Sequence, residues 1–164
     1  MNLSEILNCI SRAVGKMDIP FGDDTTPSQK KNFQELLKEE FERNLPPCSA
    51  GIEHIFSSDE NGSRDRGDVY AETSTYQIIV ELDATRADQV AKKMISRYYY
   101  ANKMTNGKPT VYICLLYPGT KSMNPSECVK YMEMGREILL ALNPANRFIG
   151  AFLNERTVEW KNIG

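Results

Sequence analysis

The sequence predicts an α/β domain with a mixed sheet, in which an antiparallel meander is followed by parallel strands and helices flank the sheet. Three β-rich runs follow one another between residues 51 and 83, and two later apolar runs are each preceded by a long helical pattern. A helix between two strands returns the chain in parallel, because the connection must cross the sheet. The chain of 164 residues is long enough for one core.

Composition and charge narrow the class of protein. Hydrophobic residues make up 41% and charged residues 26%, as in ordinary globular domains, so a disordered chain is not expected. No run approaches the roughly 20 apolar residues of a membrane span, and the N-terminus lacks a secretion-signal pattern. A cytoplasmic protein without membrane contact is therefore expected. The net charge of -2 speaks against nucleic-acid binding through bulk positive charge, so any phosphate binding must be local.

The first 24 residues are predicted to form a helix and a linker, placed before a single domain of residues 25 to 164. Apolar side chains recur at three- and four-residue steps between Leu3 and Val14, as in an amphipathic helix that packs on the domain or on a partner. The linker is rich in Pro and Asp. Its Thr-Pro-Ser ending signals the start of a helix over residues 28 to 44.

The rest of the chain alternates between strand and helix patterns. The predicted strands cover residues 51 to 57, 68 to 73, 76 to 83, 110 to 117 and 147 to 153. The predicted later helices cover residues 85 to 101 and 125 to 142. Only Ser74 and Thr75 separate the second strand from the third, which indicates a hairpin, whereas the polar segment before the second strand is predicted to be a loop.

Three acidic residues are expected to meet at one end of this hairpin. Side chains alternate along a strand, so Glu81 and Asp83 project from the same face at the end of a strongly apolar strand. If the hairpin turn is tight, Asp68 lies near both of them. Carboxylates held this close repel one another unless a cation compensates, and Mg²⁺ is a usual one. The alternative is a solvated strand end whose acids only face water.

At these residues the chain resembles the PD-(D/E)XK nuclease superfamily, which has the restriction-endonuclease-like fold. Its core is a helix, a three-strand meander, a crossover helix and another strand, with an Asp at the start of the second strand and E-x-K at the end of the third. The resemblance covers about residues 28 to 118, or to residue 153 with the last strand. Asp68 stands at the Asp position, Glu81 at the acid of E-x-K, and Asp83 where the family has Lys.

The resemblance implies a hydrolase that cleaves phosphodiester bonds in nucleic acid, with DNA as the first expected partner and Mg²⁺ or Mn²⁺ as the cofactor. It implies Asp68, Glu81 and Asp83 as metal ligands, with Asp83 alternatively a general base. Family members often add a Glu from the first helix, and Glu40 is the candidate, because it falls within that helix's apolar face. The alternative for Glu40 is a side chain that extends from the edge of this face to solvent.

The missing motif Lys leaves the activity open. Arg86 and Lys93 lie on one stripe of the following helix and could supply the charge, or they could belong to a solvated basic face. Arg97 shares the stripe and is expected to be solvated. The rival hypothesis is a catalytically inactive protein of the same fold that serves as a binding or assembly subunit, and a homodimer is compatible with either. An unrelated α/β interaction domain is a third hypothesis.

Other chemistry has less support in the sequence. The four cysteines are scattered and His54 is the only histidine, so neither a zinc site nor a disulfide framework is expected. The chain also lacks the glycine-rich phosphate-binding motifs and the G-x-S-x-G pattern of serine hydrolases. A nucleophile paired with histidine would depend on His54 alone.

Overall fold

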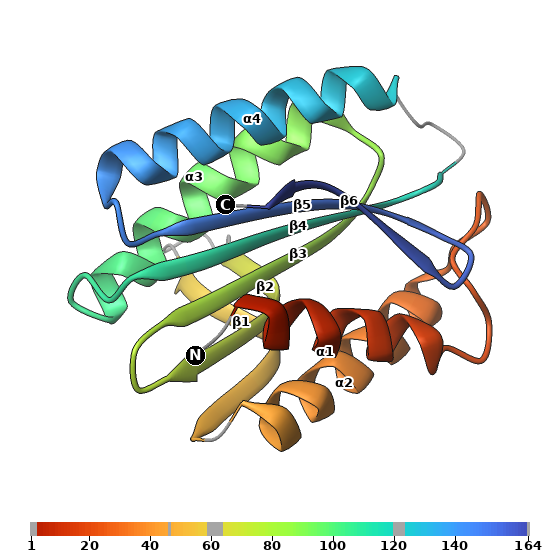
Figure 1. Cartoon of the computed structure of the whole chain (residues 1–164), viewed down its shortest axis with the longest axis horizontal. Coiled ribbons are helices and arrows are strands. Elements are labelled where there is room, and N and C mark those ends of the chain that lie inside the picture. The colour runs from red at the N-terminus through yellow and green to blue at the C-terminus, as the bar shows by residue number, and fades with distance from the viewer. Residues whose placement is uncertain (1–2, 46, 59–63, 120–123, 164) are drawn as a thin grey trace.

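A six-stranded sheet with helices on both faces forms the protein (Figure 1). The computed structural model describes residues 3–45, 47–58, 64–119 and 124–163. The helices are α1 (Leu3–Gly15), α2 (Pro27–Asn44), α3 (Ala87–Met104) and α4 (Pro125–Leu142). The strands are β1 (Cys48–Ser58), β2 (Arg64–Thr73), β3 (Gln77–Ala84), β4 (Thr110–Tyr117), β5 (Arg147–Asn154) and β6 (Thr157–Ile163).

The strands lie in the sheet in chain order, from β1 to β6. The first three form an antiparallel meander, β3, β4 and β5 are parallel, and β6 returns antiparallel to β5. The two parallel connections contain α3 and α4, because parallel neighbours need a crossover connection, which a helix usually forms. The predicted α/β class with a mixed sheet is confirmed, and the order α2, meander, α3, β4 is the one that the resemblance implies.

Two apolar layers hold the sheet between the helices. α1 and α2 cover one face, and α3 and α4 cover the other (Figure 1). The alternation along β3 divides its side chains between these layers: Ile78 and Val80 pack toward α1 and α2, whereas Ile79 packs toward α3 and α4. Each of these side chains is fully buried, and such burial contributes about 1.5–3 kcal/mol apiece.

The N-terminal helix α1 is part of the first layer. Ile6, Ile10 and Val14 lie at helical steps along its inner face and are buried against the sheet and α2. The segment predicted as a linker also contributes, because Phe21 is buried and stacks on Tyr117 with ring centroids 5.7 Å apart. None of the described helices is long and apolar enough to cross a membrane.

Two parts of the fold differ from the sequence prediction. β1 and β2 pair up to Ser58 and Arg64, so the predicted loop is shorter than expected. Turn-forming residue types can occupy a strand when the partner strand supplies their backbone hydrogen bonds. β6 was not predicted either, although Val158 and Trp160 alternate along it and pack against the layer that contains α1.

Candidate functional site

Asp68 and Glu81 meet where β2 and β3 separate. The last ladder pair at this end joins Val69 to Val80, so one further step places Asp68 opposite Glu81. Beyond that pair, the Leu82 N–H of β3 donates to the Asp68 side chain of β2, at Oδ2 and 2.7 Å, instead of to a backbone carbonyl. The predicted antiparallel pairing of the two strands is confirmed, and it follows from the short turn at the other end of the hairpin.

The second oxygen of Asp68 is held by α2. Gln34 Nε2 donates to Asp68 Oδ1 at 2.7 Å, and the Gln34 side chain is buried. The sequence prediction missed Gln34. A signal was present, because Gln34 lies three residues before Leu37 and seven before Phe41, so it occupies the apolar face of α2. A glutamine in such a stripe needs a buried polar partner.

Two cations reach the acids from α3. Lys93 Nζ lies 2.8 Å from Asp83 Oδ2 and 3.4 Å from Glu81 Oε2. One turn later, Arg97 Nε donates to Glu81 Oε1 at 3.2 Å. The expectation that Arg97 is solvated is wrong, because its side chain is only 15% exposed and packs beside Glu81. The cationic stripe of α3 therefore faces the end of β3, where Glu81 and Asp83 lie.

Arg86 does not join this group of side chains. It precedes α3, and its guanidinium pairs with Asp88 at 2.8 Å, with both side chains about half exposed. Of the two cations that the sequence offered in place of the motif Lys, Lys93 is therefore the one in contact with the acids. The two cations differ in their position along the helix. Arg86 precedes the first turn of α3, whereas Lys93 lies two turns further along, beside Glu81 and Asp83.

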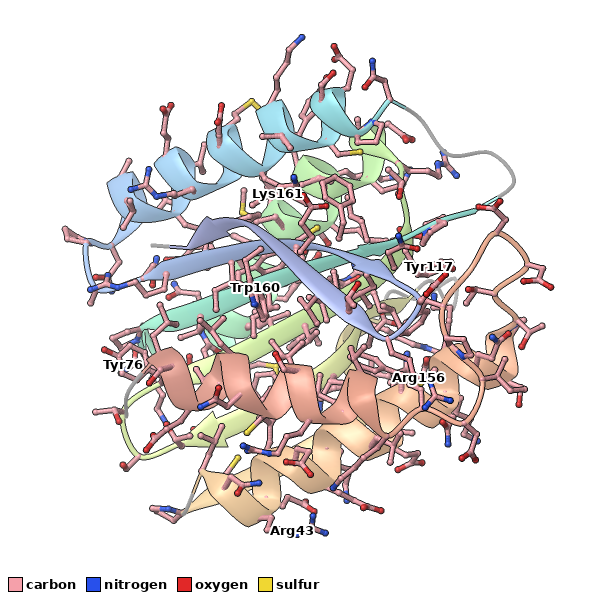
Figure 2. The ribbon with its side chains drawn as sticks, turned by 45° about the vertical axis from the view of Figure 1, so that its right-hand side comes forward. Arg43, Tyr76, Tyr117, Arg156, Trp160 and Lys161 are labelled. Carbon is pink, nitrogen blue, oxygen red and sulfur yellow. The ribbon has the colours of Figure 1, made fainter. Side chains whose placement is uncertain are left out.

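Glu40 is also held elsewhere. Its buried carboxylate accepts from Arg12 of α1 at 2.6 Å and from Asn44 at 3.0 Å, and Arg43 lies 3.4 Å away. Glu40 follows Gln34 by six residues, about 9 Å along the helix axis. Figure 2 shows Arg43 at the end of α2 that lies away from Tyr117. The assignment of Glu40 to the metal site is therefore corrected: its burial comes from the contact between α1 and α2.

The acids differ in their electrostatic environment. Burial and the nearby charge of Asp68 raise the pKa of Glu81 to about 7, although Lys93 and Arg97 oppose this. Burial also raises the pKa of Asp68, and Lys30 of α2 opposes it more than any other cation. Burial acts to lower the pKa of Lys93, but the charges of Glu81 and Asp83 outweigh it and raise that pKa. Lys93 is therefore protonated at neutral pH.

The packing around Glu81 explains its burial. Gly67 lies beside it, and a Cβ at that position would be 2.9 Å from the Phe56 ring and 3.7 Å from Glu81 Oε1. The glycine thus allows the aromatic ring to cover the carboxylate. A cavity of about 10 Å³ is lined by Glu81, Asp83, Gln89 and Lys93 and by apolar and aromatic side chains, and it has room for about one water molecule.

Asp68 and Glu81 are the two carboxylates that could hold a divalent cation. In the part of the chain that the structure describes, no three Asp, Glu, His or Cys side chains form a group that could hold a metal ion, so the four predicted ligands are not assembled. Mg²⁺ often uses one or two carboxylates, with water and substrate phosphate as the remaining ligands. Asp68 and Glu81 supply that pair, and a bound cation would relieve the repulsion between them.

Comparison with known proteins finds no matching family model and no matching curated protein. Two solved structures are similar to the chain. The small subunit of the heterodimeric restriction endonuclease R.BspD6I has a TM-score of 0.46 and 14% identity, with 92% of this chain and 72% of that chain covered. Pyrococcus furiosus SfsA in complex with Ca²⁺ has a TM-score of 0.38 and 15% identity, with 81% and 61% covered. The function is therefore inferred from the chain's own side chains.

Proposed function

We propose that the chain is a metal-dependent nuclease that hydrolyses phosphodiester bonds in nucleic acid, with DNA as the first candidate substrate. The observation that carries the proposal is the position of the Lys93 ammonium, 2.8 Å from Asp83 and 3.4 Å from Glu81. Compared with the PD-(D/E)XK motif, the sequence has both acids, Asp68 and Glu81, and lacks the Lys that follows the second acid. Lys93 supplies this charge from α3, although it lies ten residues beyond the motif position.

The side chains divide the chemistry between them. Asp68 and Glu81 would hold Mg²⁺ or Mn²⁺, which when bound lowers the pKa of a water ligand and neutralises phosphate charge. Lys93 remains protonated, so it cannot take a proton and acts instead as a donor to an anionic phosphate oxygen. Asp83 fixes the position of Lys93 through their ion pair and is the candidate acceptor for the proton of the attacking water.

A second function has one specific observation in its favour. Arg97 donates to Glu81 Oε1 at 3.2 Å, and Lys93 lies near the other oxygen of the same carboxylate. These two cations can satisfy Glu81 without any metal ion. The alternative is therefore a catalytically inactive protein of this fold, in which the charged group is a structural ion-pair network of a binding or assembly subunit.

Cleavage assays separate the two functions. Purified protein should cut single- or double-stranded DNA or RNA in the presence of Mg²⁺ or Mn²⁺, and Glu81→Gln should abolish cutting. Lys93→Ala should lower kcat by at least tenfold and weaken substrate binding much less, because a charge aimed at the transition state affects rate. Lys92→Ala is the matched control, since Lys92 is the exposed neighbour on the same helix. Absence of cutting by the wild type with either metal across a range of pH would favour the inactive subunit.

A further inference from the structure

A groove opens beside Asp68 on the face of the sheet that α2 covers. Its volume is about 370 Å³, and its lining residues are Pro27, Lys30, Lys31, Gln34 and Glu53. Gln34 connects the groove to the acids, because its amide lines the groove and donates to Asp68 at 2.7 Å. The Gln34 side chain therefore separates this groove from the candidate metal site.

The groove carries positive charge that its own acid does not neutralise. Glu53 is paired with Arg66 at 3.0 Å. Within the described ranges, neither Lys30 nor Lys31 has a carboxylate within ion-pair distance, and the nearest recorded partner of the Lys30 ammonium is the Tyr117 ring, 5.9 Å from its centroid. Tyr117 lies at the end of β4, on the side of the segment that joins α1 and α2 (Figure 2).

Cations thus flank the acid pair on both faces of the sheet. Lys30 and Lys31 come from α2 on one face, and Lys93 and Arg97 come from α3 on the other, with Asp68 between them where the β2–β3 ladder ends. The charge of Lys30 reaches Asp68, because it opposes the burial-driven rise in the pKa of that carboxyl group. An extended polyanion that passes the end of the β2–β3 ladder would meet Lys30 and Lys31 on one face and Lys93, which is 24% exposed, on the other.

We propose that this groove binds a backbone phosphate of the nucleic acid adjacent to the one that is cleaved, with Lys30 and Lys31 as its charged contacts. The inference rests on the proposed function and names the path of the substrate across that site. A phosphate fits better than a base, because the residues recorded as lining the groove include two ammonium groups and no aromatic ring. The substrate strand then runs from the first turns of α2, past the end of the β2–β3 ladder, to α3.

The test measures binding without cleavage. Glu81→Gln protein without metal is titrated with a fluorescently labelled oligonucleotide at several salt concentrations. Adding Lys30→Ala or Lys31→Ala should weaken binding several-fold and reduce the slope of log Kd against log salt by about one per lysine. Lys38→Ala is the matched control on α2, because Lys38 pairs with Glu42 at 3.1 Å and lies about 12 Å along the helix from Lys30. It should leave the slope unchanged.

Two further arms separate the sources of phosphate and the two proposals. Inorganic phosphate should compete with the oligonucleotide only weakly, whereas a 5′-phosphorylated dinucleotide, which carries two successive phosphates for the acid pair and the groove, should compete strongly. If the wild type cuts but the Lys30→Ala and Lys31→Ala variants keep the parent affinity and salt slope, the groove proposal is overturned and the nuclease survives. If the wild type never cuts and the two variants still reduce the salt slope, the proposal that the groove binds phosphate stands and the nuclease proposal fails. Failure of the Glu81→Gln protein to bind any nucleic acid overturns the groove proposal.

Discussion

The Arg12 guanidinium donates to the Glu40 carboxylate at 2.6 Å and so joins α1 to α2. Glu40 is only 1% exposed, and Lys16 of the segment after α1 contacts its other oxygen. A carboxylate at this depth is stable only because cations and an amide satisfy its oxygens. These contacts with Glu40 fix α1 to α2, so that α1 forms part of the first apolar layer.

Removing this carboxylate charge should loosen α1 without affecting the acid pair. Glu40→Gln is expected to lower the free energy of unfolding by about 2 kcal/mol, the usual value of hydrogen bonds to charged groups. Urea denaturation measures the loss, and Glu39→Gln is the control, because Glu39 is 60% exposed on the same helix. A stability equal to that of the wild type would contradict the clamp between α1 and α2.

Glu81 should make the protein less stable as the pH rises. Its pKa is raised from 4.5 to about 7 in the folded protein, so the folded state binds more protons than the unfolded state between these values. Stability attributable to Glu81 is therefore present below about pH 4.5 and is lost as the pH rises through about 7. Urea unfolding at pH 5 and pH 8 without metal should show this decline, and Glu81→Gln should remove it. A decline of equal size in both proteins would exclude Glu81 as its source.

A divalent cation should stabilise the folded protein through Asp68 and Glu81. At ten times its Kd, Mg²⁺ or Mn²⁺ is expected to add about 1.4 kcal/mol to the free energy of unfolding, which raises the melting temperature. Glu81→Gln should abolish this response, whereas Glu40→Gln should retain it, because Glu40 lies outside the site. A response lost in Glu40→Gln would restore that residue as a ligand, and no response in the wild type would leave the acids as an ion-pair network.

Gln34 should control metal affinity through Asp68. Replacing it with Leu removes the donor to Asp68 Oδ1 while keeping the apolar face of α2, so the carboxylate loses one of the two hydrogen bonds that orient it. Metal affinity should fall about tenfold, as when other outer partners of metal ligands are removed. Isothermal titration with Mn²⁺ measures the change. Gln29→Ala is the control, since Gln29 belongs to the capping box of the same helix, and an equal loss there would indicate a general effect of α2.

The pairing of the hairpin strands could be predicted from the sequence because each step is local. Strand alternation places Glu81 and Asp83 on one face, and a two-residue turn places Asp68 opposite Glu81. Helical periodicity also placed Lys93 on one stripe with Arg86 and Arg97, but it left open which of these cations contacts the acids.

The remaining site residues depend on contacts between distant elements. Glu40 and Gln34 both occupy the inner face of α2, and periodicity alone cannot tell which one meets Asp68 and which one meets α1. Arginine is a residue type that is usually solvated, and Arg97 is buried only because α3 packs beside Glu81. β6 has a weak alternating pattern and becomes a strand by pairing with β5.

The hydrogen bond between the Leu82 amide and Asp68 gives the site a spectroscopic reporter. A backbone proton that donates to a carboxylate responds in its chemical shift and exchange rate when that carboxylate gains a proton or a metal ion, because the acceptor loses negative charge. One resonance, from an apolar residue that takes no part in the chemistry, would therefore record the charge state of Asp68. Protonation and metal binding at Asp68 can then be followed in the intact protein, without altering any of the charged side chains.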